Sequence, residues 1–387
     1  MNILGHPLAK LEAAGGSWTA REIAHQPAVW ARIEDVMARE ARAVRAFLDP
    51  LLARQDLRIV LTGAGTSAFV GECLAPALKH RTKRRVDAVA TTDLVGSPGS
   101  ALEPAVPTLL VSFARSGGSP ESVAALTLAE QGVLDCHHLI VTCNAAGDLY
   151  RQGRQLRNAH ILLLPEETND RGFAMTSSFT GMMLAAALAF DLLPQDRPAA
   201  LAGWASVVLD TGLAQIAELA RSDFERVIYL GGDTFKGLAR EAALKLLELS
   251  DGKVVALAET PLGFRHGPKT IVNGKTLVVM FLANDPHARR YEMDVLRELR
   301  TDGVAGRVVA LQGCAGRAEP WPPETIAVPD ATGACDLALC FPYAVFAQTF
   351  AFLRSLELGL RPDTPNARGV VNRVVQGVSI YPWDPSR

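Results

Sequence analysis

One apolar stretch that occurs twice decides the fold. Residues 58–63 read Arg58-Ile59-Val60-Leu61-Thr62-Gly63, and residues 226–231 read Arg226-Val227-Ile228-Tyr229-Leu230-Gly231. A second stretch, Thr108–Phe113, matches Thr276–Phe281. Both pairs have the same offset, because 226 − 58 and 276 − 108 both equal 168. A shared register over separate apolar stretches indicates two copies of one structural unit.

A third pair of stretches extends the match, because Leu139–Val141 falls on Arg307–Val309 at the offset of 168. Each stretch is short and apolar throughout, which is typical of strands buried on both faces of a parallel sheet. Helical patterns separate the strands, and we expect helices at residues 68–78, 120–131, 176–193, 235–249, 287–300 and 341–358. This alternation predicts an α/β chain with two tandem, doubly wound, three-layer αβα domains and mainly parallel sheets.

The repeat also sets the expected domain boundaries. We predict an N-terminal helical segment at 1–44, a first repeat domain at 45–195, a linking helical segment at 196–214, a second repeat domain at 215–365 and a C-terminal tail at 366–387. A helix at Gln26–Leu52 is expected to pack on the first copy. The aromatic end of the tail, Ser379–Trp383, is expected to be docked rather than loose.

The composition excludes several classes of protein. The 387 residues are 49% apolar and 21% charged, which is ordinary for a globular chain and unlike a disordered or collagenous one. The net charge of −2 gives no electrostatic footprint for nucleic acid. The longest apolar stretch, Met182–Phe190, is far shorter than the ~20 residues that a membrane span needs. Met1–Ala14 lacks a secretory apolar region. We therefore expect a cytoplasmic protein with neither nucleic acid nor membrane as a partner.

The cysteines and histidines show no metal-binding spacing. The six cysteines, at positions 73, 136, 143, 314, 335 and 340, form no C-x-x-C pair and no zinc pattern with histidine. His137 and His138 are adjacent, so on a strand they point to opposite faces and are expected to be structural. We predict reduced thiols, no metal and no cofactor.

Two loops at predicted carboxyl ends of strands are rich in glycine and hydroxyl groups. The first is Gly63-Ala64-Gly65-Thr66-Ser67, and the second is Ser112–Ser119, which runs into Pro120 and a helix. Ligands of parallel sheets bind at these strand ends, and helix N-termini favour anions. We therefore predict a compact cup for a terminal phosphate monoester, formed by Gly65, Thr66, Ser67, Arg115, Ser116, Gly117 and Ser119.

Two alternatives to the phosphate cup remain open at this point. Gly63, Gly65 and Ala68, with Asp87 about twenty residues on, also satisfy a dinucleotide fingerprint. Dinucleotide loops rely on bare backbone, so the hydroxyls at positions 66 and 67 favour the monoester. In the second alternative, the hydroxyl groups only cap the helices that follow.

The second copy keeps the strand but replaces the cup. Its loop, Gly231-Gly232-Asp233-Thr234, carries an acid that would repel a phosphate, so we expect this copy to supply chemistry instead. Glu241, Lys245 and Glu248 are spaced i, i+4, i+7 and share one helix face. A solvated, ion-paired stripe is the plain alternative for these three residues.

A histidine follows in an irregular loop of the second copy. His266 stands between Gly263 and Gly267-Pro268, and functional residues collect in such rigid loops. An ordinary surface histidine is the alternative.

Taken together, these motifs resemble the SIS (sugar isomerase) domain family. The shared features are Gly65-Thr66-Ser67, Ser116-Gly117-x-Ser119, Glu241-x-x-x-Lys245-x-x-Glu248 and His266-Gly267-Pro268. The tandem arrangement is similar to the isomerase half of glucosamine-6-phosphate synthase. The stretches 91–95, 167–171, 175–179 and 372–377 resemble a narrower branch, the AgaS-type galactosamine-6-phosphate deaminase/isomerases or tagatose-6-phosphate ketose/aldose isomerases.

The resemblance implies a role for each matching residue. Ser67, Ser116 and Ser119 would hold the phosphate, and Thr66 would lie near the sugar chain. Glu248 matches the proton-shuttling glutamate and His266 the ring-opening histidine, and Glu241 and Lys245 match supporting positions.

Two positions depart from the synthase pattern. Ala114 replaces a serine of the cup, and Gln376 aligns near the lysine that forms an imine with the ketose. A glutamine cannot form an imine, so Gln376 is at most a tail contact.

The resemblance implies an amino-sugar phosphate deaminase/isomerase that converts galactosamine 6-phosphate to tagatose 6-phosphate and ammonia. A plain aldose–ketose 6-phosphate isomerase is the main alternative. A non-catalytic protein that senses sugar phosphates is an alternative of another class. The family's habit implies a homodimer or a dimer of dimers, with a small-molecule sugar phosphate as the other partner.

Overall fold

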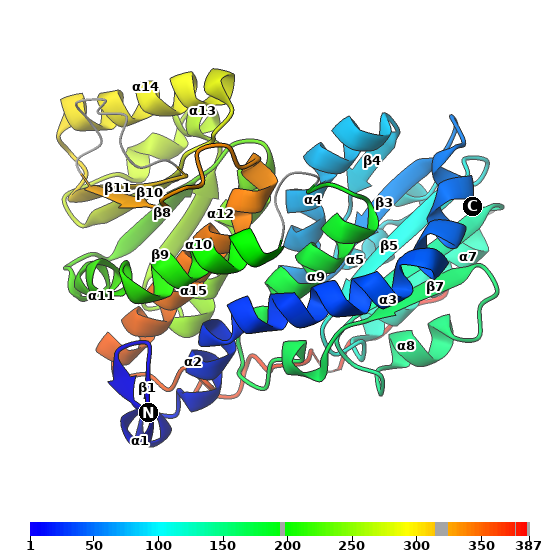
Figure 1. Ribbon diagram of the computed structural model, residues 1–387, viewed down its shortest axis with the longest axis horizontal. Coiled ribbons are helices and arrows are strands. Elements are labelled where there is room, and N and C mark those ends of the chain that lie inside the picture. The colour runs from blue at the N-terminus through cyan, green and yellow to red at the C-terminus, as the bar shows by residue number, and fades with distance from the viewer. Residues whose placement is uncertain (194–197, 314–323, 376, 385–387) are drawn as a thin grey trace. The chain divides into compact units, whose positions relative to one another are not determined.

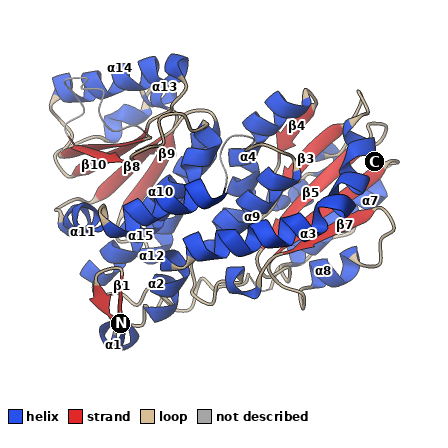
Figure 2. Ribbon diagram, in the orientation of Figure 1, coloured by secondary structure: helices blue, strands red, loops and turns tan. Residues whose placement is uncertain are grey.

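The chain folds into two compact units, each built around a parallel sheet (Figures 1 and 2). The structure is a computed structural model that describes residues 1–193, 198–313, 324–375 and 377–384. The first-repeat unit comprises residues 29–170, 177–192 and 369–387, and the second-repeat unit comprises residues 1–28, 171–176 and 193–368.

The first-repeat unit contains five parallel strands in the order β4-β3-β5-β6-β7. Their bounds are β3 Arg58–Thr62, β4 Arg85–Ala88, β5 Thr108–Ala114, β6 Cys136–Thr142 and β7 Ala159–Leu163. Every residue of β3 and β5 is buried, as expected for apolar strands covered on both faces. Strand order reverses between β3 and β5, which makes the carboxyl ends of these two strands the topological switch point.

The second-repeat unit repeats this topology with the strand order β12-β11-β10-β8-β9. The bounds are β8 Arg226–Leu230, β9 Val255–Glu259, β10 Thr276–Phe281, β11 Arg307–Gln312 and β12 Glu324–Ala327. Arg58 pairs with Thr108 in the first sheet, and Arg226 pairs with Thr276 in the second. The predicted offset of 168 is therefore confirmed for the first two strand pairs, as is an α/β chain with parallel sheets.

The predicted offset is wrong for the third pair of strands. Leu109 pairs with His137, whereas Leu277, its counterpart at the offset of 168, pairs with Arg307. Arg307 thus corresponds to His137 rather than Leu139, and the offset is 307 − 137 = 170. A slip of two residues keeps each side chain on the same face of the sheet, so apolar patterning cannot detect it.

Helices in the first-repeat unit follow the predicted pattern. They are α3 Gln26–Leu52 (its first turn belonging to the other unit), α4 Thr66–Thr82, α5 Thr91–Gly96, α6 Pro98–Ala101, α7 Pro120–Gly132, α8 Asp148–Gly153, η1 Glu166–Thr168 and α9 Ser177–Ala189. Trp30 of α3 donates to the Thr180 hydroxyl of α9 at 3.1 Å, so α3 packs on the first copy as expected. Helix α9 is shorter at both ends than the predicted 176–193.

The second-repeat unit includes the N-terminal elements. These are β1 Asn2–Ile3, β2 His6–Pro7, α1 Leu8–Ala13 and α2 Ser17–Ala24, followed later by α10 Pro198–Asp210, α11 Leu213–Arg221, α12 Thr234–Leu249, α13 Pro261–Phe264, η2 Pro268–Ile271, α14 Pro286–Asp302 and α15 Asp336–Glu357. Helix α15 starts five residues before the predicted 341. Proline is common in the first turn of a helix, but Pro342 lies inside this one.

Helix α15 is also the described helix that is long and apolar enough to cross a membrane by length and composition. The bent pair α10–α11 passes the same test only when counted as one span. The apolar window of α15 is 94% buried within the fold, which is the environment of a core helix.

The C-terminal tail belongs to the first-repeat unit. Trp383 packs against an apolar cluster that includes Leu102 and Val133, so the predicted docking of the tail is observed at this residue. Tyr381, two residues earlier, is 81% exposed. The tail therefore combines one docked aromatic ring with one that faces solvent.

Candidate active site

The loop between β3 and α4 is shaped by two glycines. A side chain at Gly63 would place its Cβ only 2.5 Å from the carbonyl carbon of Ser67, so the tight turn requires glycine there. Gly65 has φ +56°, a conformation that favours glycine, and it precedes the first residue of α4. This geometry brings the amino end of a 17-residue helix to the switch point.

Thr66 and Ser67 lie in the first turn of α4 and are 3% and 4% exposed. The residue that caps α4 is Gly65, and no side chain provides a capping hydrogen bond. The capping alternative is therefore wrong for these two hydroxyls. The Ser67 and Ala68 backbone N–H groups donate to the Ala64 and Gly65 carbonyls, so the amino end of α4 offers an anion the positive end of its helix dipole and these two hydroxyls.

The loop between β5 and α7 behaves differently. Ser119 caps α7: its hydroxyl accepts from the Ser122 backbone N–H at 3.3 Å and lies 2.7 Å from the Ser122 hydroxyl. The capping alternative is thus correct for Ser119. Ser116 is half-buried, and its hydroxyl accepts from the Gly118 backbone N–H at 3.3 Å. Gly117, with φ +61°, forms the turn between them.

Arg115 connects this loop with the C-terminal tail. Its guanidinium is 6% exposed and donates to the Arg373 carbonyl at 2.5 Å. Arg373 in turn donates from Nε to the Asp170 carbonyl at 2.9 Å. Arg115 therefore holds the tail in place beside the predicted cup, and its contact with a phosphate stays a prediction. Gln376, the other predicted tail residue, lies outside the described residues.

Three further hydroxyls at the switch point were not among the predicted site residues. The Thr62 and Ser112 side chains are buried and have no hydrogen-bond partner among the described residues, and the same holds for Thr91. Thr62 and Ser112 pair directly across β3 and β5, so both side chains lie on the same face. The available signal was a polar residue at the end of an otherwise apolar strand. Buried hydroxyls without partners usually mark a place where a polar ligand or water binds.

The equivalent edge of the second-repeat unit is acidic. Asp233 stands before α12 with φ +48°, with the half-buried Asp336 and the buried Glu292 nearby. Burial raises the pKa of the Glu292 carboxyl to about 7, and the neighbouring charge of Asp336 adds to the effect. The Glu292 carboxylate accepts from the Ala283 backbone N–H at 2.8 Å. An edge with this charge disfavours a phosphate, in agreement with the sequence prediction.

Helix α12 carries a buried ionic group. Lys245 is fully buried, Glu241 is 2% exposed, and the Lys245 Nζ lies 3.6 Å from a Glu241 carboxylate oxygen. Lys245 also forms a close ion pair with Glu248, whose side chain is 23% exposed. The solvated-stripe alternative is wrong, because two of the three charged groups are shielded from water. Glu248 is the member that reaches solvent, and the ion pair holds its carboxylate in place.

His266 lies in an exposed loop whose backbone is anchored by contacts of the neighbouring residues. Phe264 is fully buried, and the Thr260 hydroxyl accepts from the Gly263 backbone N–H at 3.2 Å at the start of α13. Arg265 donates to Glu298 of α14 at 2.5 Å. Gly267, with φ +125°, adopts a conformation that a side chain would strain. The imidazole is therefore presented to solvent by a firmly anchored backbone.

Glu248 and His266 belong to layers on opposite faces of their own sheet. Phe235 of α12 packs against Phe281 of β10, whereas Phe264, two residues before His266, packs in the cluster of Met280 of the same strand. Successive residues of a strand face opposite sides of a sheet, so α12 and the His266 loop are separated by the sheet. One second-repeat unit therefore does not bring these two side chains to the same reacting atoms.

Comparisons with known proteins cover nearly the whole chain. The SIS domain family matches residues 51–192. The D-galactosamine-6-phosphate deaminase AgaS of Escherichia coli is 46% identical over 375 residues, which is 96% of this chain and 97% of the relative. The solved structure of tagatose-6-phosphate ketose/aldose isomerase from Escherichia coli has a TM-score of 0.88 at 43% identity, covering 96% of this chain and 99% of that one.

A solved structure from Clostridium novyi matches still more closely in fold. It has a TM-score of 0.95 at 40% identity and covers 99% of this chain and 100% of its own. The sequence matches and the structural matches thus point to the same family. The chain belongs to the SIS-domain family, in the branch that includes the AgaS galactosamine-6-phosphate deaminases.

Proposed function

We propose that the protein is a galactosamine-6-phosphate deaminase/isomerase that produces tagatose 6-phosphate and ammonia. The observation that carries this proposal is the switch point of the first-repeat unit, where an uncapped helix end and buried hydroxyls meet in a chain 46% identical to the Escherichia coli deaminase. This is the chemistry that a terminal phosphate monoester requires.

Phosphate binding is assigned to the two loops at this switch point. Thr66, Ser67 and Ser116 offer hydroxyls that are not consumed in capping α4 or α7, and the amino end of α4 offers the positive end of its helix dipole. Ser119 can donate its hydroxyl proton while its oxygen caps α7. Gly65 and Gly117 allow the backbone to approach the phosphate, and Arg115 adds positive charge.

Catalysis is assigned to Glu248 and His266. The pyranose ring opens when His266 moves a proton between O1 and O5, because imidazole exchanges protons near neutral pH. The Glu248 carboxylate then takes the proton from C2 of the open aldose and returns it to C1. Lys245 stabilises the negative charge that develops on O1, and Glu241 holds Lys245 in position.

Ammonia release completes the reaction. Proton transfer from C2 to C1 leaves a carbon–nitrogen double bond at C2. Water adds to this carbon and the amine leaves, so one water is consumed and one ammonia formed for each ketose phosphate. The net reaction is a hydrolytic deamination coupled to an isomerisation.

The decisive experiment is incubation with galactosamine 6-phosphate, with ammonia and ketose phosphate measured in the same sample. We expect both products in equal amounts, without added glutamine or dinucleotide. Brisk turnover of tagatose 6-phosphate without ammonia from galactosamine 6-phosphate would instead establish the plain isomerase, the activity for which the Escherichia coli relative of known structure is named. Binding without turnover of either sugar would establish the sensor.

We also propose that residues 215–365 form a second SIS domain in addition to the first at 45–195. We further propose that the protein is a homodimer or a dimer of dimers and that it lies in the cytoplasm. The two sheets share one strand order, which supports the repeat. The tail exposes apolar side chains, among them Val370, Val375 and Tyr381, and such surfaces often mark contacts between chains. Cys136, Cys143 and Cys340 are free thiols, which agrees with a reducing compartment.

A further inference from the structure

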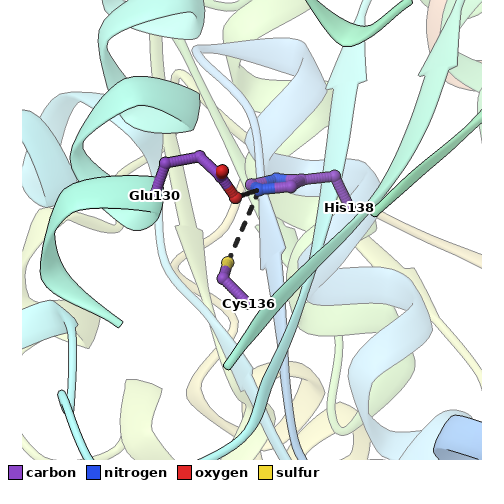
Figure 3. A group of neighbouring side chains, drawn as sticks. All are labelled: Glu130, Cys136 and His138. Carbon is purple, nitrogen blue, oxygen red and sulfur yellow. Dashed lines mark hydrogen bonds and ion pairs between the residues drawn. The ribbon is translucent and has the colours of Figure 1, made fainter. Parts of the chain in front are cut away.

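Three potential metal ligands converge at the amino end of β6, away from the switch point (Figure 3). They are Glu130 of α7 with Cys136 and His138 of β6, and their ligand atoms all lie within 4.8 Å of one another. The His138 Nε2 lies 2.7 Å from a Glu130 carboxylate oxygen and 3.5 Å from the Cys136 sulfur. Carboxylate, thiol and imidazole are all ligands that Zn²⁺ accepts.

The geometry differs from that of a catalytic triad. In a triad, the nucleophile and the orienting carboxylate bind opposite nitrogens of the imidazole. Here the sulfur and the carboxylate both face Nε2, so all three groups point toward one place. The sulfur–nitrogen distance of 3.5 Å already matches the roughly 3.5 Å between such ligands in a tetrahedral zinc site. The Glu130 oxygen lies 2.7 Å from Nε2, and this one separation would need to open by less than about 1 Å to match a tetrahedral site.

The surroundings orient the ligands and leave an entry path. Asn158 donates to the Glu130 carboxylate at 2.8 Å and to the Cys136 carbonyl at 2.7 Å, which ties the helix end to the strand. Hydrogen bonds of this kind to ligand residues fix ligand orientation in metal sites. His138 is fully buried and Cys136 is 7% exposed, whereas Glu130 reaches the surface and provides access.

A carboxylate faces the two buried ligands. The Glu130 carboxylate lies 2.7 Å from the His138 Nε2 and within 4.8 Å of the Cys136 sulfur. A divalent cation bound here stabilises the Cys136 thiolate and displaces the thiol proton.

We propose that Glu130, Cys136 and His138 form a binding site for a thiophilic divalent cation of the Zn²⁺ type, with the fourth coordination position open to water. Binding releases the thiol proton and links the end of α7 to β6. The His138 Nδ1 has no partner among the described residues, so a metal on Nε2 leaves the Nδ1 proton without an acceptor. We therefore expect weaker binding than in a closed structural zinc site.

This proposal departs from the sequence-based expectation that the protein binds no metal. The prediction considered His137 and His138, which point to opposite faces. Cys136 and His138 are two residues apart and share a face of β6, but only the packing of α7 on the sheet supplies Glu130. No zinc signature in sequence has this spacing.

Titration of the full-length protein with Co²⁺ tests the site. Thiolate coordination gives a near-ultraviolet charge-transfer band, and a tetrahedral site gives strong visible bands. We expect both to saturate at one equivalent and to disappear when Zn²⁺ is added. Cys136→Ser should abolish the charge-transfer band. Cys143→Ser is the matched control, because Cys143 is also a buried thiol whose pKa is raised to about 12 by burial.

A surface variant keeps the test independent of folding. Glu130→Gln changes only the exposed ligand and should weaken Co²⁺ binding at least tenfold. A wild-type protein without a thiolate band, or a band that survives Cys136→Ser, would overturn the site. An equal loss of the band in Cys143→Ser would overturn it as well. Neither result would bear on the deaminase reaction, which is measured separately.

Discussion

At the scale of single residues, Ser67 and Ser119 show that position within a helix turn decides what a hydroxyl can do. Ser119 caps α7, whereas Ser67 lies inside α4 and leaves capping to Gly65. We predict that Ser67→Ala weakens binding of galactosamine 6-phosphate ten- to a hundredfold, since a hydrogen bond to a charged acceptor contributes ~1.5–3 kcal/mol. Calorimetric titration measures the affinity.

Ser119→Ala should also lower stability. Loss of an N-cap costs ~0.5–2 kcal/mol, so this variant should unfold at lower denaturant concentration, unlike Ser67→Ala. Ser116→Ala, whose hydroxyl caps no helix, should behave like Ser67→Ala. If galactosamine binds as tightly as its 6-phosphate, the phosphate assignment is wrong.

Glu248 provides a second prediction at this scale. Glu248→Gln should lose several orders of magnitude in turnover while still binding substrate, because an amide cannot accept the C2 proton. In heavy water, the wild type should place solvent deuterium at C1 of the product. Mass spectrometry of the ketose phosphate checks the label. A variant that keeps most of its activity would disprove the proton-transfer role.

Glu292 gives a prediction about pH and stability. Its pKa rises from 4.5 to about 7 on folding. The folded protein therefore retains a proton that the unfolded chain releases, and stability falls as pH rises through the window between these values. Glu292→Gln should remove on the order of 3 kcal/mol of this decline, as measured by urea unfolding from pH 4.5 to 8.

Glu298 is the matched control for this pH dependence. Lys269 and Arg265 lower the pKa of its carboxyl, so its contribution is lost as pH falls. Glu298→Gln should therefore reduce the loss of stability on acidification and leave the decline toward neutral pH unchanged. A Glu292→Gln profile that runs parallel to the wild type between pH 4.5 and 7 would contradict the assignment.

At the scale of elements, helix α9 depends on one buried carboxylate. Asp170 is fully buried and accepts from the backbone N–H and hydroxyl groups of Ser177 and Ser178 at 2.5–3.0 Å. We predict that Asp170→Ala destabilises the protein by about 2–4 kcal/mol, since several buried donors lose their acceptor at once. Denaturant unfolding measures the change.

An exposed cap on another helix supplies the comparison. Asp285 accepts from the backbone N–H groups of His287 and Ala288 at the start of α14, where water can replace it. Asp285→Ala should therefore cost only about 1 kcal/mol. Equal losses in the two variants would mean that burial of the Asp170 cap contributes nothing extra.

At the scale of the whole molecule, the separation of Glu248 from His266 predicts catalysis across subunits. If His266 serves a neighbouring chain, mixed dimers of Glu248→Gln and His266→Asn each contain one intact pair. Random exchange makes half of the dimers hybrid, so the mixture should recover about a quarter of wild-type activity. Assays before and after subunit exchange measure the recovery.

The control is each variant exchanged with itself, which should stay inactive. Full activity of a strictly monomeric wild type, established by sedimentation at assay concentration, would exclude action in trans. No recovery after proven exchange would place both residues in one chain's site.

The sequence by itself determined the features that depend on neighbours along the chain. Periodicity and local sterics predict the positions of the apolar strands, of the helices between them and of the glycine turns at Gly63 and Gly65. The convergence of the hydroxyl-rich loops at the switch point could also be predicted from the sequence, because parallel strands have their carboxyl ends at the same edge of a sheet.

The tertiary structure alone decided whatever depends on partners far apart in sequence. It buried Lys245 and Glu241, which helical spacing places on one face without saying whether that face meets water or protein. It brought Glu130 to Cys136 and His138, and it shifted the third strand by two residues. In each case the local pattern is compatible with several packings, and only the contacts made across helices and strands select one.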